Sequence, residues 1–334
     1  MVHLTYVGSF PLKNTIENIT KATKDLLSIP IDYPNYVQLE DMVHQFLQPI
    51  SVKYTSGTTN YWDTEEGERY SLSRNLKTFK NSISNDAFKI LLKFSKNNEF
   101  KKDLKGIKAC VTGPFTLSSR IMLNNRNSGP FGETALSNPS VVKKITDVVS
   151  KIVGDYYKMG ADYVTIDEPM LSVLVGKNLL LNQYPDAEIV EIINKCSSEM
   201  KSLSGIHVCG RISRRLAEIL LQSNISVIDH EFKDTESNFG VYSKSDFESH
   251  DKKLGFAVTS SKIMRIESVA EIELMLTKGL KTFGKENILM VKPDCGFRGL
   301  DPKGHLDDTA YTSSISKLKN IRLAINSLQR KKIL

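Results

Sequence analysis

The sequence predicts an α/β fold of the (β/α)8 TIM-barrel type, formed by a single domain over residues 1–334. Two observations carry this prediction. Short apolar segments alternate along the chain with longer segments in which apolar residues recur every three or four positions. Several of the short segments are rich in Val and Ile without alternation, which is typical of parallel strands buried on both faces.

The expected strands, in chain order, are His3–Gly8, Ser51–Ser56, Lys108–Gly113, Asp162–Asp167, Gly205–Cys209, Val227–Phe232, Gly255–Ser260 and Ile288–Cys295. Amphipathic helices are expected at Ser140–Met159, Arg211–Gln222, Glu267–Lys281 and Tyr311–Leu328. The polar stretch 54–105, with a helical piece at Asp86–Phe94, is expected to form an extended excursion after the second strand, over the barrel mouth. An open doubly wound sheet is the alternative, although no Gly-rich phosphate loop follows the first strand.

The composition is that of a soluble enzyme-sized chain, with 334 residues, 40% apolar residues and a net charge of +7. No run approaches the roughly 20 apolar residues that cross a bilayer. The start, MVHLTYVGSFPL, lacks the features of a secretory signal, so we expect a cytoplasmic protein with no membrane partner. The lysines are spread out rather than forming a basic stripe with aromatics, so nucleic-acid binding is not expected.

Three of the predicted strands end in residues that bind zinc in proteins. In GIHVCG, His207 and Cys209 are two positions apart, so their side chains share one side of the strand. Glu231 lies near the end of the sixth strand and Cys295 at the end of the eighth. Because parallel strands of a barrel end at one face, these side chains can form a single catalytic zinc site. Ordinary core packing of His207 and Cys209 is the alternative, with a surface Glu231 and no metal.

At these residues the sequence resembles the cobalamin-independent methionine synthase family. The matching motifs are VGSFP (7–11), EDMVHQF (40–46), VTGPFT (111–116), IDEP (166–169), HVCG (207–210), the Glu231 strand and PDCG (293–296). They resemble the carboxyl-terminal catalytic barrel of that enzyme in a short form. Nothing in these 334 residues corresponds to the amino-terminal barrel of the longer members.

The resemblance implies roles for individual residues. His207, Cys209, Glu231 and Cys295 match the zinc ligands. Ser9 matches a residue that holds the carboxylate of the amino-acid substrate. Asp167 matches a catalytic carboxylate that binds the substrate ammonium group. The structural alternatives are that Ser9 is a helix N-cap, and that Asp167 or Glu168 caps the helix after Pro169.

The sequence also departs from the family pattern where a folate donor would bind. Arg120 stands near the position of a tryptophan, and Phe297-Arg298-Gly299 replaces a Lys-Thr-Arg run after PDCG. A histidine suspected as a proton donor is absent from VTSSKIM, where Lys262 lies nearby. We therefore expect a methyl donor other than a polyglutamyl folate.

Together these features predict a methyltransferase that moves a methyl group to the zinc-bound thiolate of L-homocysteine and yields methionine. Its donor would be methylcobalamin, a corrinoid protein or a methylated pterin. One alternative is a corrinoid-dependent methyltransferase for another thiol, such as coenzyme M. The other is a catalytically silent zinc-binding barrel that serves as a subunit of a complex. Glu231 and Asp167 favour an amino-acid thiol over the first alternative, and Ser9 with an ammonium-binding Asp167 argues against the second.

Overall fold

A computed structural model of the chain describes residues 2–47, 52–56, 68–72, 85–101, 104–123, 134–175, 184–200, 203–301 and 308–334. Its main sheet has seven strands in the order β1-β10-β9-β8-β7-β6-β4, and every neighbouring pair is parallel. The strands are β1 (His3–Leu4), β4 (Lys108–Thr112), β6 (Tyr163–Asp167), β7 (Leu203–Val208), β8 (Val227–His230), β9 (Lys253–Thr259) and β10 (Ile288–Pro293).

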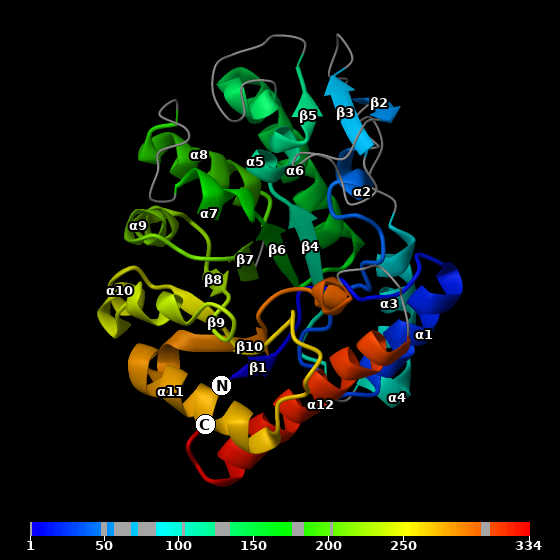
Figure 1. Ribbon diagram of the computed structural model, residues 1–334, viewed down its shortest axis with the longest axis vertical. Coiled ribbons are helices and arrows are strands. Elements are labelled where there is room, and N and C mark those ends of the chain that lie inside the picture. The colour runs from blue at the N-terminus through cyan, green and yellow to red at the C-terminus, as the bar shows by residue number, and fades with distance from the viewer. Residues whose placement is uncertain are drawn as a thin grey trace.

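The helices pack on the outer side of a curled sheet (Figure 1). They are α1 (Ile16–Leu27), α2 (His44–Leu47), α3 (Asp86–Ser95), α4 (Asn98–Lys101), α5 (Pro114–Ser119), α6 (Pro139–Met159), α7 (Met170–Leu174), α8 (Asp186–Ser197), α9 (Arg214–Gln222), α10 (Lys244–Ser249), α11 (Val269–Phe283) and α12 (Asp308–Arg330). The main predicted helices correspond to α6, α9, α11 and α12. Because strand neighbours follow chain order, with no reversal of the kind that defines a doubly wound sheet, that alternative is wrong.

The predicted second strand, Ser51–Ser56, is not part of the main sheet. Instead β2 (Val52–Ser56) pairs antiparallel with β3 (Glu68–Leu72), which pairs with β5 (Ile121–Met122) in a separate three-stranded sheet. Residues 52–56 read Val-Lys-Tyr-Thr-Ser, and this mixed sequence lacks the continuous apolar run of a parallel strand buried on both faces.

Segment 33–38 takes the place between the two edge strands of the main sheet. Parallel backbone bridges join Thr5 to Tyr33, and Asn35 to Lys108 at the start of β4. The Lys108 N–H donates to the carbonyl of Pro34 at 2.9 Å. Pro34 lacks an N–H and so made this segment a poor strand candidate in the sequence, although its carbonyl can still accept.

Part of the predicted excursion 54–105 lies outside the described residues, namely 57–67, 73–84 and 102–103, so its placement over the barrel mouth stays a prediction. Within the ranges that are described, no helix is both long and apolar enough to cross a membrane.

Candidate metal centre

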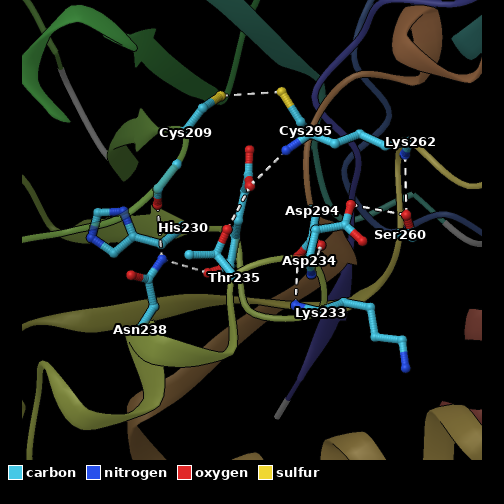
Figure 2. Close-up of polar contacts among 12 residues, drawn as sticks. Cys209, His230, Lys233, Asp234, Thr235, Asn238, Ser260, Lys262, Asp294 and Cys295 are labelled. Carbon is cyan, nitrogen blue, oxygen red and sulfur yellow. Dashed lines mark hydrogen bonds and ion pairs between the residues drawn. The ribbon is translucent and has the colours of Figure 1, made fainter. Parts of the chain in front are cut away.

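Three of the four predicted ligands meet at the carboxyl ends of β7 and β10. The ligating atoms of His207, Cys209 and Cys295 all lie within 4.8 Å of one another. The His207 Nε2 is 2.9 Å from the Cys209 Sγ, which is 3.1 Å from the Cys295 Sγ, the contact drawn at the top of Figure 2. Gly210 follows Cys209 with a φ of +80°, a left-handed conformation that glycine adopts without strain and that turns the chain after β7.

His207 is oriented by an acidic residue on the adjacent strand. The Asp229 Oδ1 on β8 lies 2.7 Å from the His207 Nδ1, and both side chains are buried. In a neutral imidazole, a carboxylate on Nδ1 favours the tautomer with its proton on Nδ1, which leaves Nε2 able to bind a metal. Burial lowers the pKa of His207, but the charge of Asp229 outweighs it and raises this pKa to about 9.

A buried lysine connects this pair to the turn that carries Cys295. Lys292, at the end of β10, is fully buried, and its Nζ lies 2.7 Å from the Asp229 Oδ1. It also donates to the carbonyls of Pro293 and Asp294, each at 2.9 Å. Burial opposes both charges, but their mutual attraction keeps the pKa of Asp229 lowered and that of Lys292 raised. Lys292 therefore ties His207, through Asp229, to the backbone before Cys295.

Gly255 on β9 makes room for this arrangement. In the register of the sheet it lies opposite Asp229, and a Cβ at Gly255 would approach the Asp229 Cγ to 3.0 Å. A larger residue would therefore push the carboxylate away from its partners.

Asp294 ties the Cys295 turn to the loop after Glu231. Its Oδ1 accepts from the N–H groups of Phe232 at 2.8 Å and Lys233 at 2.9 Å, and its Oδ2 accepts from the N–H of Asp234. Figure 2 shows Asp294, in the Cys295 turn, beside Lys233 and Asp234 of this loop. Burial raises the pKa of Asp294 to about 7, although these backbone donors favour the ionised form. The segment ends that carry Cys295 and Glu231 are thus fixed to each other.

Glu231, the fourth predicted ligand, lies outside the close group of three. Its Oε2 accepts from the Thr235 hydroxyl at 3.0 Å and from the Lys262 Nζ at 3.1 Å. Burial raises the pKa of Glu231, but Lys262 outweighs it and leaves the pKa lowered. The carboxylate is therefore ionised and paired with a lysine in this structure.

The hydrogen bond between the two cysteines shifts their pKa values in opposite directions. The hydrogen bond from Cys209 lowers the pKa of Cys295 well below its usual value, against the effect of burial, and His207 lowers it further. The same hydrogen bond, together with burial, raises the pKa of Cys209. Two sulfurs and an imidazole whose other nitrogen is held by a carboxylate form a donor set that fits Zn²⁺.

The three donors open onto a cavity of about 220 Å³, which is small for a ligand site and suits a molecule of amino-acid size. Its lining includes Ser9, Gln38, Asp167, Lys262 and Arg298. The structure thus brings both predicted substrate-binding residues, Ser9 and Asp167, to the cavity with His207, Cys209 and Cys295.

Asp167 ends β6 beside His207, its partner in the register of the sheet. Burial raises its pKa to about 6, and its Oδ1 has no hydrogen-bond partner among the described residues. An unpaired buried carboxylate oxygen favours a cationic group of a ligand. Asp167 does not cap a helix, because α7 has no side-chain cap.

Ser9 and Glu168 do not have the helix-capping roles that were their structural alternatives. Ser9 caps no helix, because α1 is capped by Thr15. It lies against Gly296, where a Cβ would come within 1.9 Å of the Ser9 Oγ, so only glycine permits this approach to the Cys295 turn. Glu168 accepts from the N–H groups of Phe115 at 3.0 Å and Thr116 at 2.7 Å, and so binds the start of α5 rather than its own helix.

Sequence reasoning missed Asp229, Lys292 and Asp294. A signal for the first two was present, since VIDHEF and VKPDCG each place a charged residue within a strand that is otherwise largely apolar. Charges in buried strands need partners, and here the partners are each other.

Comparisons with known proteins identify the family of the chain. The model of the family "Cobalamin-independent synthase, Catalytic domain" matches residues 92–317. Methionine synthase of Methanocaldococcus jannaschii is 27% identical over 224 residues, which are 64% of this chain and 63% of that protein. Methionine synthase of Methanothermobacter thermautotrophicus is 28% identical over 220 residues, or 66% and 63%. The match thus spans less than two thirds of the length of these curated relatives.

Among solved structures, a B12-independent methionine synthase from a Shewanella species, in complex with selenomethionine, superposes with a TM-score of 0.70. It is 15% identical, and the alignment covers 100% of this chain and 99% of that one. A methyltransferase from Methanosarcina mazei has a TM-score of 0.59 at 15% identity, covering 96% and 86%. These likenesses support the fold. Because the family model matches more than half of the chain, the protein belongs to the cobalamin-independent methionine synthase family, whose catalytic domain it carries.

Proposed function

We propose that the chain is a zinc-dependent homocysteine S-methyltransferase of the methionine synthase type. The observation that carries the proposal is that His207, Cys209 and Cys295 converge at a cavity lined also by Ser9 and by Asp167, whose Oδ1 has no partner within the described part of the chain. We further propose one domain over residues 1–334, closed as a (β/α)8 barrel with segment 33–38 as its second strand.

In this proposal His207, Cys209, Glu231 and Cys295 hold Zn²⁺, with Glu231 as the exchangeable ligand because it lies outside the close group. When bound, the metal lowers the pKa of a substrate thiol so that it is a thiolate, and hence a nucleophile, at neutral pH. The protein supplies the rest of the chemistry by binding and orientation.

Asp167 binds the ammonium group of homocysteine, and Ser9 donates to its carboxylate. The two side chains line the cavity beside the sulfur and imidazole donors, so an amino acid held at both ends presents its side-chain thiol to the metal centre. The Shewanella relative, solved with the selenium analogue of methionine, supports an amino-acid product of this kind. Burial of the Asp167 carboxylate strengthens its attraction for the ammonium group.

The test is the conversion of L-homocysteine to methionine by zinc-loaded protein, supplied in separate reactions with methylcobalamin, a corrinoid protein and a methylated pterin. We expect methionine from at least one donor. Methylation of coenzyme M but not of homocysteine would transfer the proposal to that thiol. No turnover with any donor, in protein that binds zinc, would favour a non-catalytic role.

A further inference from the structure

Lys262 is one of the basic residues that line the cavity, and its ammonium group contacts Glu231 directly. Its Nζ lies 3.1 Å from the Glu231 Oε2, the same oxygen that accepts from the Thr235 hydroxyl at 3.0 Å. The Lys262 side chain is 56% exposed, whereas that of Glu231 is 2% exposed. Figure 2 shows the lysine reaching from the loop after β9 to a position beside Cys295. One end of the pair is therefore accessible and the other is enclosed.

The loop that carries Lys262 is held in place at its base. The Ser260 hydroxyl accepts from the N–H groups of Lys262 and Ile263, each at 3.1 Å, and donates to the Asp234 carboxylate at 2.9 Å. The Ser260 N–H donates to Glu267 at 2.8 Å, and the other carboxylate oxygen of Glu267 pairs with the buried Lys317 at 2.6 Å. The backbone at Lys262 is thus fixed by a framework of hydrogen bonds, and its side chain reaches from there to Glu231.

These contacts give the Glu231 carboxylate a satisfied position away from the three close donors. A buried carboxylate without a partner is strongly disfavoured, so a ligand that leaves a metal needs a compensated place to go. Lys262 and Thr235 supply that place, with one charge and one hydroxyl on the same oxygen.

We propose that Lys262, assisted by Thr235, holds the Glu231 carboxylate when it is off the metal and thereby favours exchange of that carboxylate for the substrate thiolate. Lys262 is then a positioning residue, because it acts through Glu231. The inference rests on the proposed function above.

The exchange balances in charge and atoms. The incoming thiol gives its proton to solvent and binds as a thiolate. The Glu231 carboxylate leaves with its negative charge and pairs with the Lys262 ammonium group. One anion replaces another, so the charge of the ligand set is unchanged.

Loss of Lys262 should therefore have two effects of opposite sign. Without substrate, Glu231 lacks its competing partner and binds the metal more strongly, and a nearby positive charge that repels the cation is gone. With substrate, the released carboxylate would be buried without a counter-charge, so thiol binding weakens. A merely structural role would weaken both.

The experiment uses Co²⁺ as a spectroscopic probe in wild type and in Lys262→Met. Metal affinity is measured by competition with a chromophoric chelator. Thiol binding is measured by the thiolate-to-Co²⁺ charge-transfer absorption that L-homocysteine adds to the absorption from Cys209 and Cys295. L-homoserine, which has a hydroxyl in place of the thiol, controls for recognition of the amino-acid ends. In Lys262→Met we expect metal affinity to rise about threefold and homocysteine affinity to fall roughly tenfold.

Two variants serve as controls. Lys262→Arg keeps the charge and should retain most of the thiol affinity. Lys278→Met removes another partly exposed lysine with an acidic partner, Glu236 at 2.6 Å, and should leave both affinities within about twofold of wild type. Thr235→Val should shift both affinities as Lys262→Met does, by a smaller factor.

The outcomes separate the two proposals. If wild type binds Co²⁺ and gives the thiolate band with homocysteine, but Lys262→Met changes neither affinity or lowers both, the role of Lys262 is refuted while the function stands. If wild type binds no Co²⁺, or homocysteine adds no thiolate absorption to the Co²⁺ protein, the proposed function fails, and this inference with it.

Discussion

Replacing Lys292 with Met removes the buried cation that links Asp229 to the Cys295 turn. The Nζ–Oδ1 distance of 2.7 Å corresponds to an attraction of about 6 kcal/mol at an effective dielectric constant of about 20. The cost of burying both charges offsets much of this. Breaking the pair leaves the buried Asp229 with His207 and the more distant Lys108 as its cationic partners. We therefore expect the free energy of unfolding to fall by about 3 kcal/mol, the lower end of the range for buried ion pairs that lose one partner.

The assay is urea-induced unfolding of the metal-free protein, followed by circular dichroism, together with a Co²⁺ titration. We expect Lys292→Met also to weaken Co²⁺ binding, because His207 and the Cys295 turn lose their common support. The double variant Lys292→Met with Asp229→Asn should lose less stability than the two single losses added together, because no uncompensated charge remains. Lys278→Met is the surface control. A loss below about 0.5 kcal/mol in Lys292→Met, or strict additivity in the double variant, would refute the reasoning.

Three further predictions concern the metal ligands, the substrate and the donor. His207→Ala and Cys295→Ala should abolish turnover and weaken metal binding while circular dichroism shows the fold retained; near-normal activity in either variant would remove that residue from the ligand set. Asp167→Asn should raise the KM for homocysteine at least about tenfold, the loss of a charge-assisted bond worth roughly 1.5–3 kcal/mol, and leave zinc content unchanged. A collapse of zinc content with unchanged KM would instead place Asp167 among the ligands. A methylated polyglutamyl folate should support turnover well below roughly 1 per second in a side-by-side assay with methylcobalamin and a corrinoid protein, because Arg120 and the Phe297-Arg298-Gly299 run replace the family residues there. Folate turnover at or above that rate would contradict the donor prediction.

The sequence allowed much of the main sheet to be predicted, because strands buried on both faces leave continuous apolar runs. Six of the predicted strands after the first, from Lys108–Gly113 to Ile288–Cys295, overlap strands of that sheet. Segment 33–38 was missed because it contains Pro34 and holds its place through bridges to Thr5, directly after β1, and to Lys108 in β4. Such placement depends on neighbours that a single segment does not reveal.

The convergence of His207, Cys209 and Cys295 was predictable because strand periodicity and parallel strand ends fix where these side chains lie. The position of Glu231 was not, because it depends on Lys262, a residue 31 positions away on a different loop. The pairing of Asp229 with Lys292 was also beyond reach, since it joins residues that flank β9 and requires the small Gly255 between them. Long-range side-chain partners follow from the register of the folded sheet rather than from local pattern.

The metal content of the purified protein tests the central claim most directly. Protein purified without chelators should carry about one zinc per chain by elemental analysis. The Cys295→Ala variant, prepared in parallel and shown to be folded, should carry much less. A wild-type protein that methylates homocysteine without bound metal would contradict the claim, as would full zinc occupancy in Cys295→Ala.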